Sequence, residues 1–389
     1  MSQDRIAGVT CHPVAPRWLL VRVATSQGLV GWGEAIVPKR ARSVAGAVED
    51  LAANIEGADP DRIEELVLRM GHGGFFRGTS TTASAAAGIE QALWDIKGRR
   101  YGLPVHEFLG GAVRDRTRLY AWIGGDRPQD VVEHTRQRMK QGFSMVKMNA
   151  TEELDFIDTR ERVSQVVERV ASIRDAFGDA IEIALDFHGR VHRAMAKTLI
   201  KELEPYHPAW IEEPLAPGFE SELRHLVGPG CSIPIATGER LVHRTQFKEL
   251  FRQGAVDIVQ PDVSLTGIFE LAKIAHMAEA YDVAVAPHCP NGPVSLAASL
   301  QVGFATANVV VQEQSVGLHY NQGYAGLPAA EMFDYLIDPS PLRPVEGHLS
   351  LNPAPGLGID IDEDAVKGSR QWELRDPEWR HQDGRMAEW

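Results

Sequence analysis

The fold of this 389-residue chain is decided by the stretch Ile181-Glu-Ile-Ala-Leu-Asp186-Phe-His188-Gly189. It is apolar in the manner of a buried strand and closes with an acid, a spacer and a histidine. Because side chains alternate along a strand, Asp186 and His188 are expected on one face. A carboxylate beside an imidazole at a strand end indicates metal chemistry or proton transfer. A salt-bridged Asp beside a surface His is the alternative that this stretch alone leaves open.

The same pattern, a short apolar run closed by an ionisable residue, recurs five times downstream. The closing residues follow one another at intervals of 23 to 27 residues, about the length of one strand, one helix and two loops. Six such side chains at the C-terminal ends of successive parallel strands predict the active face of a TIM-type barrel. The five runs are Trp210–Pro214, Ile233–Arg240, Val256–Asp262, Val283–His288 and Val309–Glu313.

The rest of the chain leaves room for a second domain beside a barrel of roughly 250 residues. We expect an α/β protein with an N-terminal α+β capping domain over residues 1–115 and a modified (β/α)7β TIM barrel over residues 116–345. A C-terminal segment over residues 346–389 is expected to pack back on the capping domain. The predicted strands outside the six runs are Trp18–Val23, Leu29–Glu34, Leu119–Ile123, Met145–Asn149, Gly347–Leu351 and Gly358–Ile361, and the predicted helices are Val44–Ile55, Asp61–Met70, Thr82–Arg100, Gln129–Gln141 and Glu161–Phe177.

Composition narrows the class of partner. The formal net charge of −13 argues against nucleic acid or an anionic membrane. The three cysteines are widely spaced, which fits neither a disulfide framework nor a zinc motif and favours a reducing cytosol. With no signal segment and no run of 18 apolar residues, we expect a cytoplasmic protein. Tryptophans in the tail, Trp379 and Trp389, predict that it is docked.

Three carboxylates, Asp186, Glu212 and Glu239, close three consecutive predicted strands. They would repel one another at a barrel mouth without a cation, and hard oxygen ligands suit Mg²⁺. The alternative is that one or more of them only pairs with a basic residue such as Arg240. Glu213 is as good a candidate for the site as Glu212.

We count Leu119–Ile123 and Met145–Asn149 as barrel strands one and two, and the six runs as strands three to eight. His188 and His288 then close strands three and seven, which lie across from each other in an eight-stranded barrel. Asp262 closes strand six beside His288, and a carboxylate beside an imidazole is how a general base is built. Glu313 on strand eight could hydrogen-bond a substrate oxygen. A metal, facing histidines and an acid suit removal of a proton α to a carboxylate, with Mg²⁺ stabilising the enediolate.

The strand-end motifs also carry a family resemblance. They read Leu185-Asp-Phe-His-Gly-Arg190, Ile211-Glu-Glu-Pro214, Gly238-Glu-Arg240, Gln260-Pro-Asp262, Ala286-Pro-His-Cys-Pro290 and Gln312-Glu-Gln314. On these motifs the chain resembles the mandelate racemase subgroup of the enolase superfamily over nearly its whole length. Within that subgroup it is most similar to the D-galactonate dehydratase family.

The resemblance implies a role for each strand-end residue. One Mg²⁺ per subunit would be bound by Asp186, Glu212 and Glu239. His288, paired with Asp262, would remove the C2 proton of a sugar acid, and His188 would protonate the departing 3-hydroxyl to give a 2-keto-3-deoxy acid and water. Glu313 would hydrogen-bond the substrate carboxylate. The family implies a cytoplasmic homo-oligomer, with substrate contacts expected from Lys147, Asn149, Arg17, Arg77 and Trp389.

Other activities of the superfamily are only partly excluded. Lysine-base racemases and lactonising enzymes carry Lys-x-Lys on strand two, where this chain has Lys147-Met-Asn149, and the lactonising type has a lysine where Asp262 stands. Differences from the galactonate pattern fall at Pro38-Lys39, at Arg77–Thr81 and after strand six. The substrate is therefore expected to be D-galactonate or a related aldonate such as gluconate, arabinonate or mannonate. A racemase or epimerase that uses both histidines, and an idle binding protein, stay open.

Overall fold

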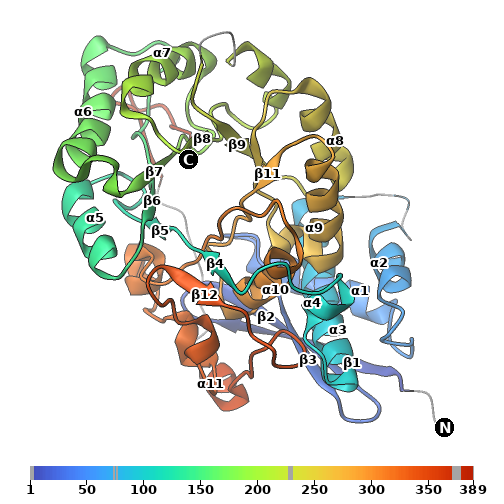
Figure 1. The fold of residues 1–389 in the computed structure, drawn as a ribbon. Helices are drawn as coiled ribbons and strands as arrows, with labels where there is room; N and C mark the ends of the chain where they lie inside the picture. Colours follow the sequence, from blue (N-terminus) through green and yellow to red (C-terminus); the bar gives the residue numbers. More distant parts are fainter. Residues whose placement is uncertain (1–3, 73–74, 76–77, 227–230, 370–377, 389) are drawn as a thin grey trace.

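The computed structural model describes residues 4–72, 75, 78–226, 231–369 and 378–388. The chain begins with an antiparallel sheet of β1 (Ile6–Val14), β2 (Trp18–Thr25) and β3 (Val30–Glu34) (Figure 1). The predicted hairpin is β2 and β3, whereas β1 was missed. β1 is an edge strand with mostly half-exposed residues and a register shift near Gly8, so its sequence lacks a clean alternation.

Three helices follow the sheet, α1 (Ala41–Ala53), α2 (Ile63–His72) and α3 (Ser80–Tyr101), close to the predicted ranges. Thr79 caps α3 by accepting a hydrogen bond from the backbone of Thr82, and Gly102 ends it with φ of 67°. α3 packs directly on β3. A Cβ on Gly33 would lie 1.8 Å from the carbonyl oxygen of Gly88, so this contact requires glycine.

A parallel sheet of seven strands curls into a barrel in the order β11-β10-β9-β8-β7-β6-β5 (Figure 1). Single parallel bridges, Val285 with Val309 and Leu119 with Gln312, close it, so the predicted eighth strand at Val309–Glu313 contributes bridges rather than a long ladder. The strands are β5 (Ala121–Trp122), β6 (Met145–Asn149), β7 (Glu182–Asp186), β8 (Trp210–Glu212), β9 (Ile235–Thr237), β10 (Ile258–Val259) and β11 (Ala284–Val285).

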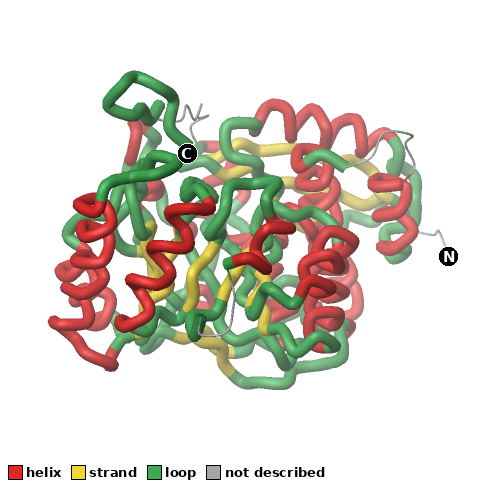
Figure 2. The backbone as a smooth tube through the Cα atoms, turned by 90° about the horizontal axis from the view of Figure 1, so that it is seen from above, coloured by secondary structure: helices red, strands yellow, loops and turns green. Residues whose placement is uncertain are grey.

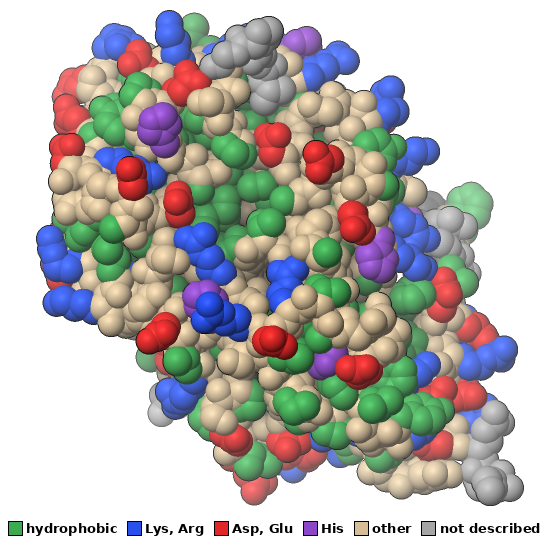
Figure 3. All heavy atoms as spheres, in the orientation of Figure 1, with side chains coloured by type: hydrophobic (Ala, Val, Ile, Leu, Met, Phe, Trp, Pro, Cys, Tyr) green, Lys and Arg blue, Asp and Glu red, His purple; other side chains and the backbone are tan. Residues whose placement is uncertain are grey.

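Helices surround the strands, as the view from above shows (Figure 2). None of the helices among the described residues is long and apolar enough to span a membrane. On the face drawn in Figure 3, acidic and basic side chains are interspersed. The helices are α4 (Val105–Phe108), α5 (Val131–Lys140), α6 (Arg160–Phe177), α7 (Arg193–Leu203), α8 (Arg244–Gln253), α9 (Val263–Glu279) and α10 (Pro293–Ala305), with short 3-10 turns at Gly178–Ala180, Glu204–Tyr206, Glu220–His225, His319–Gln322, Tyr324–Gly326, Met332–Tyr335 and Ser340–Leu342.

The C-terminal part returns toward the start of the chain. β12 (His348–Ser350) pairs antiparallel with β4 (Arg116–Arg118). The predicted strand at 358–361 is wrong, because this segment forms only a single bridge, from Ile361 to Leu336. It is instead held against α3, where Arg99 donates to the Ile359 carbonyl at 2.6 Å, and it leads into α11 (Glu363–Gly368). The domain limits at 115/116 and 345/346 stay predictions.

Two buried carboxylates join the N-terminal elements to the barrel. Glu34 at the end of β3 accepts hydrogen bonds from the backbone N–H groups of Gly292 (2.7 Å) and Ser295 (3.0 Å) at the start of α10. Glu90 of α3 accepts two backbone N–H groups, each at 2.8 Å, where Gly267 interrupts α9 with φ of 73°. Helix starts have unpaired N–H groups that such carboxylates satisfy. One contact thus lies within α9, the helix after β10, and the other at the start of α10, the helix after β11.

Candidate active site

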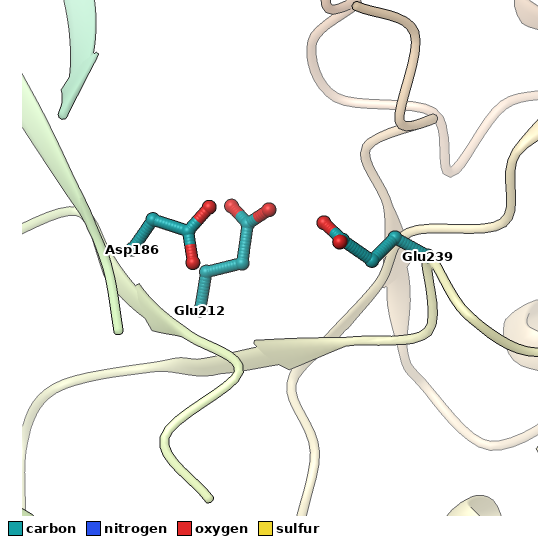
Figure 4. Close-up of side chains that lie close together, drawn as sticks. All are labelled: Asp186, Glu212 and Glu239. Atoms are coloured by element: carbon teal, nitrogen blue, oxygen red, sulfur yellow. The ribbon is translucent and has the colours of Figure 1, made fainter. Parts of the chain in front are cut away.

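Asp186, Glu212 and Glu239 come together at the barrel mouth. Asp186 ends β7, Glu212 ends β8, and Glu239 follows β9 by two residues. Figure 4 shows their carboxylates pointing toward one another, and one oxygen from each lies within 4.8 Å of the others. All three side chains are buried. This geometry suits a small cation bound by oxygen ligands.

The charges at this site favour a cation. Burial and the neighbouring Glu212 raise the pKa of Asp186 well above its usual value, and Lys147 only partly opposes them. Lys147 Nζ lies 2.6 Å from Glu212 Oε1, 3.4 Å from Glu313 Oε1 and 3.7 Å from Asp186 Oδ2. Asp186 Oδ2 accepts no hydrogen bond from the described residues. The donor set therefore fits a divalent metal ion, with Lys147 lying among its ligands.

The ambiguity between Glu212 and Glu213 is resolved by Arg240. Arg240 Nε lies 2.9 Å from both carboxylate oxygens of Glu213, and Nη2 lies 2.7 Å from one of them. Glu213 has φ of 41°, in the left-handed region, and it is not among the carboxylates whose oxygens converge within 4.8 Å of one another. Glu213 is thus an ion-pair partner.

His288 forms a close pair with Asp262, as expected. Its Nδ1 lies 2.7 Å from Asp262 Oδ2, while Nε2 lies 3.4 Å from Glu239 Oε2. Burial disfavours the imidazolium, but Glu239, Glu313 and Asp262 outweigh it and raise the pKa of His288 to about 10. Asp262 is itself fixed by Ser264 and Asn291, which donate to it at 2.7 Å and 3.0 Å. Neither residue was predicted, because no periodicity marks them.

His188 lies in a different setting. β7 ends at Asp186 and His188 has φ of 55°, so the alternation argument that placed both on one strand face is wrong. The His188 backbone N–H donates to Asp186 Oδ1 at 2.6 Å. Its Nδ1 lies 3.1 Å from Asn149 Oδ1 and 3.3 Å from Arg190 Nη2. Burial, reinforced by Arg190 and Arg240, lowers the pKa of His188 well below its usual value.

The two histidines follow strands on opposite sides of the barrel. β7 and β11 are four positions apart in the strand order, and the bridges through residues 309–312 supply the eighth position. Four steps around an eight-stranded barrel correspond to opposite sides. The predicted placement is therefore confirmed by the topology.

Glu313 is buried between the two histidine-bearing sides. Its Oε2 accepts a hydrogen bond from the Cys289 backbone at 2.7 Å, and its Oε1 accepts one from Trp122 Nε1 at 2.5 Å. Lys147 Nζ lies 3.4 Å from the same oxygen, Glu313 Oε1. Trp122 was not predicted, although it stands in the first barrel strand.

The other residues predicted to contact the substrate lie in separate parts of the structure. Asn149 holds His188, and Arg17 is buried on the turn between β1 and β2, where its Nη2 donates to the Pro290 carbonyl at 3.1 Å. Arg77 and Trp389 lie outside the described residues. The tail before Trp389 contacts the barrel, because the ring of Trp379 lies 3.8 Å from the Arg127 guanidinium.

A second polar group, which we call the Asp126 cluster, was not predicted. It consists of Asp126 after β5, His319, Tyr320 and Tyr324 from the 3-10 turns after strand eight, and Arg17. Asp126 Oδ1 accepts hydrogen bonds from Tyr320 (2.7 Å) and His319 (3.0 Å). The Arg17 guanidinium lies 4.0 Å from the Tyr320 ring centroid. Arg17 alone was expected to contact the substrate; loops without periodicity supply the other four residues, so the sequence carried no signal for them.

Two parts of the chain match known protein families. Residues 7–110 match the mandelate racemase / muconate lactonizing enzyme N-terminal domain, and residues 130–365 match the enolase C-terminal domain-like family. The chain belongs to the mandelate racemase / muconate lactonizing enzyme family. The expected placement in the enolase superfamily, with its α/β barrel, is thereby confirmed.

Individual members of this family are similar over the whole chain. D-galactonate dehydratases of Xanthomonas oryzae pv. oryzae (strain PXO99A) and Ralstonia pickettii (strain 12J) are 47% and 48% identical, covering 99% of this chain and 100% of each relative. A solved enolase from Agrobacterium radiobacter, proposed to be a galactarate dehydratase and bound to Na and L-malate, is 30% identical. It has a TM-score of 0.87 and covers 98% of this chain and 99% of its own.

Proposed function

We propose that the chain is a Mg²⁺-dependent dehydratase that converts D-galactonate, or a closely related aldonate, to a 2-dehydro-3-deoxy acid and water. The observation that carries the proposal is the unequal pair of histidines on opposite sides of the three carboxylates. A dehydration needs one group to remove a proton and another to donate one to the leaving hydroxyl. The similarity to D-galactonate dehydratases over the full chain supports the choice of substrate.

His288 is the group suited to remove the C2 proton. The Asp262 carboxylate, 2.7 Å from Nδ1, favours proton uptake by the imidazole and leaves Nε2 available to the substrate. The electron pair left by the C–H bond then forms the C2–C3 double bond as the C3–O bond breaks. The resulting enol tautomerises to the 2-keto acid.

His188 is the group suited to deliver a proton to the 3-hydroxyl. An amide and a guanidinium lie beside it instead of a carboxylate, and Asn149 Oδ1 can accept the Nδ1 hydrogen so that Nε2 is available to the substrate. Since hydroxide is a poor leaving group, the C3–O bond breaks with proton transfer from His188, and water departs.

The metal and the neighbouring polar groups complete the site. Asp186, Glu212 and Glu239 would hold Mg²⁺, which supplies Lewis acidity toward the substrate carboxylate. Lys147 and Glu313 lie beside these ligands and are placed to orient that carboxylate, with Trp122 and the Cys289 backbone fixing Glu313. We also propose a homo-oligomer in the cytoplasm, which size-exclusion chromatography with light scattering and cell fractionation would test.

A racemase that uses both histidines as bases is the competing proposal, and the asymmetry of the two sides argues against it. The test is a screen of aldonates and uronates with the Mg²⁺-loaded protein, scored both for keto acid and for an epimer at C2. We expect a 2-keto-3-deoxy product from D-galactonate and none from the Glu212→Gln variant. An inverted C2 centre without keto acid would replace the dehydratase by an epimerase.

A further inference from the structure

We propose that the Asp126 cluster is the subsite for the hydroxylated tail of the substrate, beyond C3, and that it selects acids long enough to reach it. This inference rests on the proposed dehydratase function and deepens it. The ligand it would take is a neutral chain of carbons bearing hydroxyl groups, attached to a 2,3-dihydroxy acid.

The cluster contains a buried acceptor and a buried donor that the described residues leave largely unsatisfied. Asp126 is 4% exposed and Arg17 is 7% exposed. Among the described residues, Arg17 Nε has no hydrogen-bond partner, and Asp126 has only the hydroxyl of the half-buried Tyr324 to supplement the bonds at Oδ1. Buried polar groups are nearly always paired in folded proteins. Two such groups of opposite character in one cluster therefore point to a ligand.

Tyr320 links these two groups into one surface. Its hydroxyl donates to Asp126 Oδ1 at 2.7 Å, and its ring lies 4.0 Å from the Arg17 guanidinium. A hydroxyl group both donates and accepts hydrogen bonds, so a polyol chain can satisfy the carboxylate and the guanidinium together. A carboxylate only accepts and would be repelled by Asp126.

The position of the cluster fits the order of atoms in the substrate. C2 must face His288 and C3 must face His188, so C4 and the later carbons continue past His188. His188 Nδ1 lies 3.1 Å from Asn149 Oδ1, and Asn149 Nδ2 donates to the Asp126 backbone carbonyl at 3.2 Å. On the other side, Arg17 donates to the carbonyl of Pro290, two residues after His288. Asp126 therefore lies next to the His188 side, toward which C4 and the later carbons continue, and Arg17 reaches the segment that follows His288.

The test compares two acids that share the C2 and C3 configuration. Binding of D-galactonate and of the matched four-carbon aldonate to the Mg²⁺-loaded full chain is measured by calorimetry, and keto-acid formation is measured in parallel. We expect the wild type to bind D-galactonate more tightly. Asp126→Asn should weaken D-galactonate binding about 10-fold to 100-fold, the range for a charged hydrogen bond, and change four-carbon binding less than about twofold.

Two further variants separate recognition from structural damage. Tyr320→Phe removes one donor to Asp126 and keeps the ring, so it should shift the ratio of the two affinities in the same direction by a smaller factor. Asp95→Asn alters another buried aspartate, which accepts from Trp32, Arg99 and Leu357 away from the cluster. It should lower Tm and leave the ratio unchanged.

The outcomes for the subsite and for the enzyme are distinct. Equal wild-type affinity for the two acids, or an equal loss of both in Asp126→Asn, overturns the subsite even when keto acid forms normally. Length-dependent binding that Asp126→Asn abolishes, without any keto acid, upholds the subsite and overturns the dehydratase. Absence of binding by either acid overturns both.

Discussion

The two histidine-bearing sides of the barrel differ in the charge that surrounds them. His288 contacts Asp262 and lies near Glu239 and Glu313, so its setting is anionic. His188 contacts an amide, Asn149, and a guanidinium, Arg190, so its setting is neutral to cationic. The same imidazole is thus made a stronger base on one side and a stronger acid on the other.

The comparison teaches that the strand-end motifs alone do not assign the roles. Both histidines follow barrel strands and both are half-buried, and a symmetric pair would suit racemisation. The partners at Nδ1, a carboxylate for His288 and an amide for His188, are what separate base from acid.

The largest loss of turnover should come from a change in the three-carboxylate site, which serves both histidines. Glu212→Gln removes a charge from the three-carboxylate site and leaves its shape, so turnover should fall at least about 1,000-fold and Mg²⁺ should no longer raise Tm. Calorimetric Mg²⁺ titration and circular dichroism separate metal loss from unfolding. Full activity in excess chelator would contradict the metal assignment.

On the His288 side, Asp262→Asn should lower kcat about 10-fold to 100-fold with little change in KM. The amide can no longer hold the imidazole in the basic state that the carboxylate provides. Steady-state kinetics measure this effect. A larger change in KM than in kcat would mean that Asp262 contacts the substrate.

On the His188 side, Asn149→Ala should lower kcat about 5-fold to 10-fold, because a neutral hydrogen bond contributes less than a charged one. The exchange of the C2 proton with deuterated solvent, which depends on His288, should be nearly unaffected. Loss of both activities together would show that Asn149 supports the whole site.

The smallest effect on the chemistry should come from the contact between α3 and α9. Glu90→Ala leaves the backbone N–H groups at the interruption of α9 unpaired and should lower the free energy of unfolding by about 1–3 kcal/mol. Denaturant unfolding measures it. The ratio of turnover to C2 proton exchange should stay constant, since Glu90 contacts neither histidine. A changed ratio would show that the contact between α3 and α9 affects the active site.

The sequence predicted those parts of the fold that repeat. The residues at the barrel strand ends, including Asp186, Glu212 and His288, follow from short apolar runs at regular intervals, and their convergence follows from parallel strands. β1 was not predicted, because an exposed edge strand shows no alternation of apolar and polar residues.

The contacts between side chains could not be predicted in the same way. His188 occupies a turn with positive φ, which the strand pattern does not reveal. Lys147 reaches three carboxylates, including Glu212, only through the register of β6 with β7 and β8. Asp126 and Tyr320 are 194 positions apart and meet because loops from the first and last barrel strands lie together.

The division of labour between the histidines is tested most directly with a 3-fluoro analogue of the substrate. Fluoride leaves without being protonated, so His188→Asn should fail on the natural acid yet release fluoride from the analogue. His288→Asn should fail on both, because nothing removes the C2 proton. Fluoride release is followed with an ion-selective electrode, and circular dichroism checks that both variants fold. Release by His288→Asn, but not by His188→Asn, would show that the two roles are reversed.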